Sequence, residues 1–126
     1  MTYILQVWKK NGPVRLKKKY STFKAARKDA YDKLMFGKTP IKFIEIIDVD
    51  DRLHVGTVHW GTTSSGPWKN YDKIVMDAGG EMNNGGWYVR SDGSLTPTEA
   101  HKWGKSKKNP YYTSYTFKQV EKRLKE

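Results

Sequence analysis

Residues 41–60, IKFIEIIDVDDRLHVGTVHW, contain two strand-like segments joined by a short acidic turn. Residues 41–49 carry apolar side chains on both faces, which is typical of a strand in the middle of a sheet. Asp50 and Asp51 favour a turn, and residues 53–60 then return as a further strand. The stretch therefore predicts a central strand over residues 41–49, joined by a turn to a further strand over residues 53–60.

Two more strands are expected before this pair. Residues 2–9 are rich in Tyr, Ile, Val and Trp, and Asn11-Gly12 suits a tight hairpin turn. The alternation that follows predicts a second strand, with one face formed by Val14, Leu16, Lys18 and Tyr20 and a cationic face formed by Arg15, Lys17 and Lys19.

Residues 20–38, YSTFKAARKDAYDKLMFGK, have the spacing of an amphipathic helix. Thr22 is the expected N-cap, and Gly37 is the expected C-terminal stop. A narrow stripe of small and apolar side chains is expected to lie against the sheet, and it consists of Phe23, Ala26, Ala30 and Leu34.

The second half of the chain is predicted to be loop-rich, with short strands at 73–77 and 87–90. Thr96-Pro97-Thr98-Glu99 combines a capping box with Pro at the first helical position, which predicts a short helix from 97 to about 103. Thr116 and Gln119 repeat the capping-box signal for a terminal helix, whose inward side chains are expected to be Phe117, Val120 and Leu124.

These elements predict an α+β fold with a mainly antiparallel sheet. The expected order is β-β-α-β-β, a loop-rich middle with short strands, and then α-α. A chain of 126 residues is the size of one domain, so residues 1–126 are expected to form a single domain.

Composition excludes several classes of site. The chain has no cysteine, which excludes disulfides, thiolate metal ligands and cysteine catalysis. No apolar run approaches the roughly 20 residues of a membrane helix, and no signal peptide is recognisable. We therefore expect a soluble, cytoplasmic protein without membrane contact.

Charge is distributed unevenly along the chain. Residues 1–40 hold eleven Lys and Arg against two Asp, a net charge of +9, whereas residues 41–100 have a net charge of −4. Residues 101–126 have a net charge of +6. If the two basic ends fold onto one side around the acidic middle, they form a face that binds nucleic acid or another polyanion. The alternative is a lysine-rich composition that serves solubility.

Catalytic and metal-binding motifs are not recognisable. His54 and His59 are five positions apart, so on one regular strand they point to opposite faces unless a bulge intervenes. Asp48, Asp50 and Asp51 could hold a cation, but they lack the glycine and distant Glu of a calcium loop, and a hairpin turn explains them. Nucleophile and phosphate-loop motifs are absent. We expect no enzyme activity and no cofactor.

The start of the first predicted helix is the main candidate site. A helix N-terminus is already positive, so cations there are unfavourable until an anion binds. The residues expected to hold such an anion are Lys17, Lys18, Lys19, Thr22, Lys24, Arg27 and Lys28. A solvated helix face with local pairs such as Lys28–Asp32 explains the same pattern, and both interpretations remain open.

A second candidate is the basic, aromatic segment that follows the predicted short helix. Stacking surfaces beside cations are used by proteins that bind single-stranded nucleic acids. The residues expected to take part are Lys102, Lys105, Lys107, Lys108, Tyr111 and Tyr112.

The leading hypothesis is a non-enzymatic module that binds the phosphate backbone of DNA or RNA with little sequence preference. The alternative is a protein-binding, inhibitory or accessory module of the kind found in mobile elements. Its cationic face would then cover an acidic partner, such as a nucleic-acid enzyme. A metal-dependent nuclease is a third possibility, but the acidic residues have no recognisable spacing.

Overall fold

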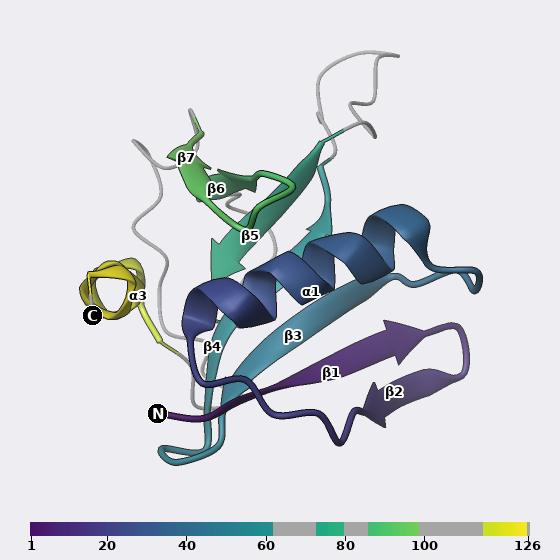
Figure 1. The fold of residues 1–126 in the computed structure, drawn as a ribbon, viewed down its shortest axis with the longest axis horizontal. Coiled ribbons are helices and arrows are strands. Elements are labelled where there is room, and N and C mark those ends of the chain that lie inside the picture. Colours follow the sequence, from purple (N-terminus) through teal and green to yellow (C-terminus); the bar gives the residue numbers. More distant parts are fainter. Residues whose placement is uncertain (62–72, 80–85, 99–114, 126) are drawn as a thin grey trace.

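The computed structural model of this chain describes residues 1–61, 73–79, 86–98 and 115–125. These residues form one antiparallel sheet, with a helix against one face and a second helix at one end (Figure 1). The elements are β1 (Tyr3–Lys9), β2 (Gly12–Arg15), α1 (Phe23–Phe36), β3 (Phe43–Asp48), β4 (Leu53–Trp60), β5 (Ile74–Ala78), β6 (Trp87–Val89), β7 (Leu95–Pro97) and α3 (Phe117–Leu124). The chain is thus a single small α+β domain, as expected.

The sheet has seven strands in the order β2-β1-β3-β4-β5-β6-β7. β1 pairs with β2 on one side and with β3 on the other, so the connection through α1 crosses one face of the sheet. From β3 onward each strand pairs with the next one along the chain. The strand predicted to be central over residues 41–49 is β3, and the further strand predicted over residues 53–60 is β4.

Helix α1 begins and ends where its capping residues predict. The Thr22 hydroxyl accepts a hydrogen bond from the Ala25 N–H at 3.1 Å, and the Gly37 N–H donates to the Lys33 carbonyl at 3.0 Å. The predicted stripe is confirmed, because Phe23, Ala26, Ala30 and Leu34 are all buried. Alanines at two of these positions let the helix backbone lie close to the sheet.

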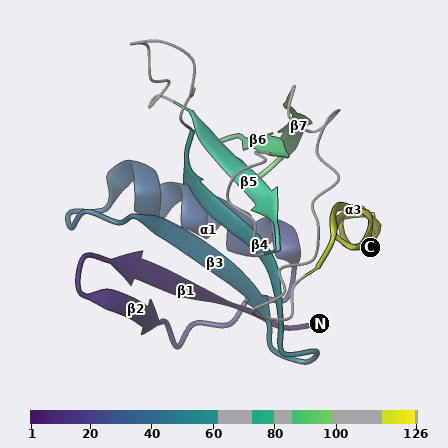
Figure 2. The same cartoon turned by 180° about the vertical axis from the view of Figure 1, so that it is seen from behind.

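The main core lies between α1 and the sheet. Side chains of alternate residues on the central strands enter it, and they include Leu5, Val7, Ile44, Ile46, Val58 and Met76. The Phe23 ring stacks on Tyr3 with 5.6 Å between ring centroids. The opposite face of the sheet is not covered by either described helix (Figure 2). That uncovered side is called the open face below.

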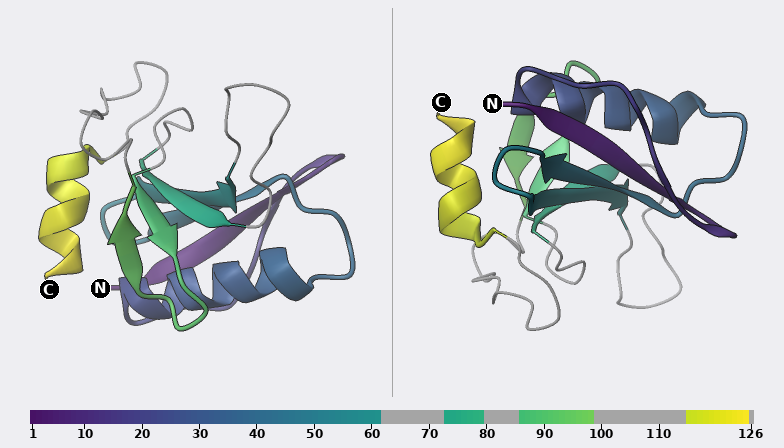
Figure 3. Two further views of the ribbon diagram at one scale, coloured as in Figure 1. Left: turned by 90° about the horizontal axis from the view of Figure 1, so that it is seen from above. Right: turned by 90° about the horizontal axis from the view of Figure 1, so that it is seen from below.

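Helix α3 is held at one end of the sheet, close to the N-terminus (Figure 3). Its predicted capping box is present, with Thr116 and Gln119 bonded to each other's backbone N–H groups. Phe117 packs against Trp87 with 5.2 Å between ring centroids, and Val120 is fully buried. Neither described helix has the length and apolar character that a bilayer-spanning segment needs.

The acidic β3–β4 turn anchors α3. Asp48 Oδ1 accepts hydrogen bonds from the backbone N–H groups of Asp50 and Asp51, at 3.0 and 3.2 Å. Arg123 on α3 forms ion pairs with Asp48, at 2.8 Å, and with Asp51. Tyr115 also donates to Asp51 at 2.8 Å. The turn interpretation is confirmed, and no group of metal-binding side chains occurs among the described residues.

Two expected elements differ from the structure. The second strand stops at Arg15, and the ladder with β1 resumes only at an isolated bridge between Tyr3 and Tyr20. Leu16 still donates its N–H to the Leu5 carbonyl. The four-residue step from Leu16 to Tyr20 therefore lies opposite a step of only two residues on β1, from Leu5 to Tyr3. Residues 17–19 therefore leave the line of the strand, and no continuous cationic face forms.

The helix expected to start at Thr96 is wrong at its first residues. Thr96 and Pro97 instead belong to β7, where they pair with Tyr88 and Trp87. Pairing along the edge of the sheet outweighs a local capping signal at these positions. Thr98 is not helical either, because its N–H donates to the Gly86 carbonyl at 3.1 Å, and the expected helix from residue 99 onward lies outside the described residues.

Candidate functional site

A row of polar side chains crosses the open face. Cross-strand register places Arg15 opposite Gln6, Gln6 opposite Glu45, Glu45 opposite Thr57, and Thr57 opposite Asp77. Residues that pair in register share one face of a sheet, so these five side chains form one line over five neighbouring strands. We call them the polar row.

A β-bulge in β4 brings both strand histidines to this face. Ile46 pairs with Gly56 and Ile47 pairs with His54, which leaves Val55 as an extra residue. The extra residue shifts the alternation, so His54 lies on the same face as His59. The expectation that these histidines point to opposite faces is therefore wrong, because it holds only for a strand without a bulge.

Glu45 is the centre of the hydrogen-bond network. Its Oε1 accepts from Gln6 Nε2 at 3.0 Å and from the indole N–H of Trp8, and its Oε2 lies 2.8 Å from His54 Nδ1. Arg15 donates to the Gln6 side-chain oxygen from Nε and Nη2, at 3.3 and 3.2 Å. Burial alone raises the pKa of Glu45, but the hydrogen bonds and the nearby His54 outweigh it and lower the pKa overall.

The ring of His54 is fixed at both nitrogens. Nε2 lies 3.1 Å from the Gly56 carbonyl oxygen and 3.0 Å from the Thr57 hydroxyl, which itself donates to the Gly79 carbonyl at 2.9 Å. Carboxylate and carbonyl oxygens only accept hydrogen bonds, so this arrangement is satisfied when both ring nitrogens carry protons.

His59 and Asp77 form a second pair, 2.6 Å apart. Burial lowers the pKa of His59, but the hydrogen bond and charge of Asp77 outweigh it and raise the pKa overall. Asp77 is fully buried, and its Oδ1 has no hydrogen-bond partner in the described part of the chain. The pair places two titratable groups at the β5 end of the polar row.

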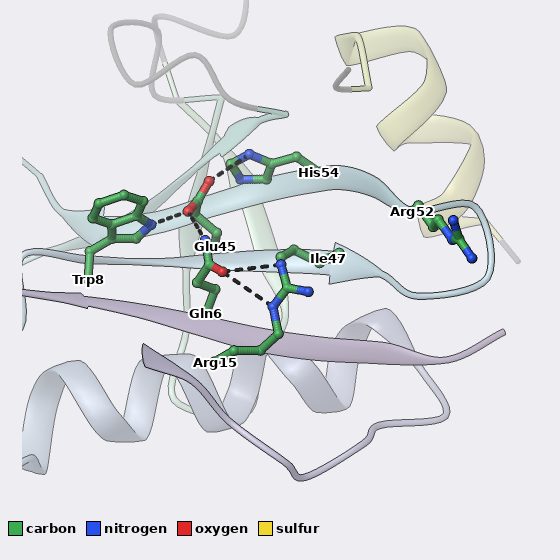
Figure 4. Close-up of a pocket in the computed structure, with 7 residues that line it drawn as sticks. All are labelled: Gln6, Trp8, Arg15, Glu45, Ile47, Arg52 and His54. Carbon is green, nitrogen blue, oxygen red and sulfur yellow. Dashed lines mark hydrogen bonds and ion pairs between the residues drawn. The ribbon is translucent and has the colours of Figure 1, made fainter. Parts of the chain in front are cut away.

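The open face is hollowed beside the polar row. The hollow has a volume of about 540 Å³ and is lined by Gln6, Trp8, Arg15, Glu45, Ile47, Arg52 and His54 (Figure 4). An adjoining depression of about 280 Å³ shares Arg15, Ile47 and Arg52 and adds Ile4 and Val49. We call the two together the open-face hollow.

Two arginines at the hollow keep free donors. Arg15 Nη1 has no partner among the residues that the structure describes, and Arg52 makes no hydrogen bond or ion pair with any of them. Arg52 also has a left-handed backbone, with φ of 53°, at the turn between β3 and β4. Figure 4 shows Trp8 near one end of the hollow, Arg52 at the other, and Arg15 between them.

Exposed lysines surround this half of the sheet. Lys10 lies in the β1–β2 turn, Lys42 precedes β3 and donates its backbone N–H to the Trp8 carbonyl, and Lys17 and Lys19 project from the segment after β2. Within the described residues none of these four ammonium groups has an acidic partner. The free cations thus lie at the β1–β2 turn and along the β2 edge.

Several of the cations predicted to bind an anion at the start of α1 lie beside carboxylates of the protein. Lys18 and Lys28 pair with Asp29 and Asp32, at 3.8 and 2.9 Å. Lys24 is exposed and lies near Asp92; hydrogen bonds from Ser94 lower the pKa of that carboxyl most, and the charge of Lys24 lowers it further. The local-pair interpretation of this helix face therefore fits the described contacts.

Arg27 does not reach the predicted surface, which is a correction. Only 5% of the residue is exposed, its Nε donates to the Gly93 carbonyl at 3.0 Å, and its guanidinium lies over the Phe23 ring. Burial lowers the pKa of Arg27 to about 10. Thr22 serves as the predicted cap and is exposed. The remaining predicted residues, Lys102, Lys105, Lys107, Lys108, Tyr111 and Tyr112, lie outside the described residues.

The residues at the hollow were not among the sequence candidates. One signal was available, because Glu45 is a lone carboxylate inside a strand of large apolar residues, and buried charges of this kind need partners. Its partners Gln6 and Trp8 come from β1 and His54 comes from β4, and only the register of the sheet identifies them.

Comparison with protein-family models, with curated proteins and with solved structures found no match for this chain.

Proposed function

We propose that the protein is a non-enzymatic module that binds nucleic acid across the β2-β1-β3 half of its open face. The observation that carries the proposal is the open-face hollow, together with the unpaired lysines at the β1–β2 turn and after β2. Glu45, the one carboxylate among its described lining residues, is already hydrogen-bonded to Gln6, Trp8 and His54. A phosphate backbone therefore meets positive charge without an uncompensated negative group.

The comparison of the two basic surfaces favours this face. Around α1, a carboxylate lies beside each of Lys18, Lys28 and Lys33, so phosphate binding there would have to displace it. Lys17 and Lys19 have no acidic partner within the described residues, so a phosphate can bind them without displacing a carboxylate. They are exposed and follow β2, the edge strand of the sheet, so we expect a polyanion bound on the open face to reach them.

The two acid–base groups that line the hollow, Glu45 and His54, are already engaged with protein partners, which supports binding without catalysis there. A general base needs a free lone pair within hydrogen-bond reach of the proton that it removes. Both nitrogens of His54 and both oxygens of Glu45 already contact protein partners. Incubation with plasmid and RNA in the presence of magnesium or manganese should leave both substrates intact.

The test is a salt titration of binding, measured by fluorescence anisotropy with labelled DNA and RNA. We expect the logarithm of the affinity to fall linearly with the logarithm of salt concentration, with little dependence on sequence. Joint replacement of Lys17 and Lys19 by Gln should reduce the slope by about 0.7–0.9 for each phosphate that the variant no longer neutralises. The matched control is Lys28→Gln, which removes an ammonium already paired with Asp32 and should leave the slope unchanged.

Binding of neither polymer below about 10⁻⁴ M, near the weak limit of non-specific affinity, would refute the proposal. That result would favour the alternative of an acidic protein partner. Capture of such a partner by the parent protein but not by the Lys17 and Lys19 variant would then identify the same edge as a protein interface.

A further inference from the structure

We infer that the open-face hollow binds a short segment of single-stranded nucleic acid, with one base against Trp8 and its phosphates toward Arg15 and Arg52. This inference rests on the proposed function and adds the strand type, the direction of the ligand and the residues that hold it. Three features of the described residues support it.

The first feature is an aromatic surface held in a fixed position. The Trp8 ring stacks against Phe43, with 5.4 Å between ring centroids and 25° between ring planes. The indole N–H donates to Glu45, so the ring is also held at its edge. A ring fixed in this way loses little conformational freedom when a base stacks on it, and such stacking contributes about 1–3 kcal/mol per base.

The second feature is an apolar floor. Ile4, Ile47 and Val49 line the part of the hollow that extends away from Trp8. Ile4 and Trp8 are four residues apart on β1, which places them about 13 Å apart at about 3.3 Å per residue. A hollow of this length and volume takes a ligand with flat apolar parts that is longer than one ring.

The third feature is the pair of guanidinium groups along the same hollow. Arg15 is anchored through Gln6 and still has Nη1 free within the described structure, while Arg52 is exposed at the far end. Guanidinium groups bind phosphate oxygens with two parallel hydrogen bonds. The order along the hollow is therefore a stacking ring, a first phosphate site at Arg15 and a second at Arg52.

This order requires unpaired bases. In a duplex the bases are stacked inside the helix and only their edges are exposed in the grooves, so a base cannot lie flat against the sheet. A single strand can turn its bases toward Trp8 while its backbone follows the arginines. The hollow therefore selects single strands, whereas the lysines of the β2 edge attract any polyanion.

The test compares single-stranded oligothymidine and oligouridine with a duplex of equal length, at one salt concentration. We expect either single strand to bind about tenfold more tightly than the duplex. Trp8→Ala should weaken single-strand binding by about 5- to 100-fold, the equivalent of one stacked base. Arg15→Gln and Arg52→Gln should each weaken it by about tenfold, as expected for removal of a charge-assisted hydrogen bond. Arg90→Gln is the matched control, because Arg90 is exposed and does not line the hollow.

A second readout separates contact from loss of fold. Two-dimensional NMR of the ¹⁵N-labelled parent should show that the indole N–H signal of Trp8 shifts with uridine monophosphate and shifts little with inorganic phosphate. Arg52→Gln changes an exposed turn residue, so it should keep the parent's thermal midpoint while it loses affinity.

The outcomes separate the two proposals. If single strands and duplex bind equally, and the two arginine variants and the control retain full affinity, the hollow is not the binding site. Loss of affinity confined to the variant at Lys17 and Lys19 would keep the proposed function and refute this inference. An absence of binding to every polymer would refute both.

Discussion

Replacement of Glu45 by Gln should lower the stability of the folded protein. The carboxylate accepts hydrogen bonds from Gln6 and Trp8 at one oxygen and faces His54 Nδ1 at the other, 2.8 Å away. The amide oxygen of Gln can still accept from the first two residues. Its NH₂ group, however, meets the ring N–H of His54, so two donors face each other and the hydrogen bond to His54 is lost.

The size of the effect follows from these contacts. Removal of one partner from a buried ion pair costs about 3–5 kcal/mol, and a hydrogen bond to a charged group contributes about 1.5–3 kcal/mol. The Glu45 side chain retains 12% of its exposed area, and Gln keeps two of the three contacts. We therefore expect a decrease of about 2–3 kcal/mol in the free energy of unfolding at neutral pH.

The substitution should also change how stability depends on pH. Because the pKa of Glu45 is lowered in the folded protein, its stabilising contribution is present above the unfolded-state value of about 4.3. The contribution is lost as the pH falls through the lower pKa of the folded state. Acid should therefore destabilise the parent more steeply than the Gln variant in this range.

Urea unfolding followed by far-ultraviolet circular dichroism measures both effects, at neutral pH and at steps down to about pH 3. Asp32→Asn is the matched control, because its carboxylate makes only an exposed pair with Lys28 and should change stability by less than about 0.5 kcal/mol. The reasoning would be refuted if the Glu45 variant were as stable as this control at neutral pH and lost stability with falling pH in the same way as the parent. The Glu45–His54 pair would then not hold the polar row together.

Two further predictions concern the ends of the network and the C-terminal helix. Arg123→Met should lower the free energy of unfolding, measured in urea, by about 2–4 kcal/mol, because the fully buried Asp48 loses its cation. The double variant Arg123→Met with Asp48→Asn should be destabilised by less than the sum of the two single variants, and strict additivity would contradict the pairing. His59 has a raised pKa, so the stabilisation from its pair with Asp77 is complete below the unfolded-state pKa near 6.5 and is lost as the pH rises through the folded value. The stability difference between the parent and His59→Gln should therefore shrink as the pH rises above the unfolded-state value of about 6.5, and a constant difference would count against this pair.

The parts of the fold that the sequence predicts well are those set by neighbouring residues. The caps at Thr22 and Gly37 and the capping box of Thr116 with Gln119 depend on contacts within one turn of a helix, so their signals are local. The buried stripe of α1 follows from helical periodicity in the same way. Thr96 shows the limit of such signals, because pairing with Tyr88 placed it in a strand.

The candidate site is harder to predict because it depends on register between distant strands. Arg15 and Asp77 belong to one polar row only because the partners between them are aligned over four ladders. The single extra residue at Val55 decides which face carries His54, and the local signal for a bulge there is the adjacent Gly56, a glycine inside a strand. Burial of Arg27 is equally non-local, since its hydrogen-bond partner is the carbonyl of Gly93.

The excursion of residues 17–19 also has a consequence for self-association. An edge strand offers unpaired N–H and C=O groups, on which a second copy of the chain could add and begin an aggregate. Here that edge runs for four residues, one of them Pro13 with no N–H, before the lysines turn outward. A second copy carries the same unpaired Lys17 and Lys19, so like charge beside the β2 edge opposes the addition of another chain there.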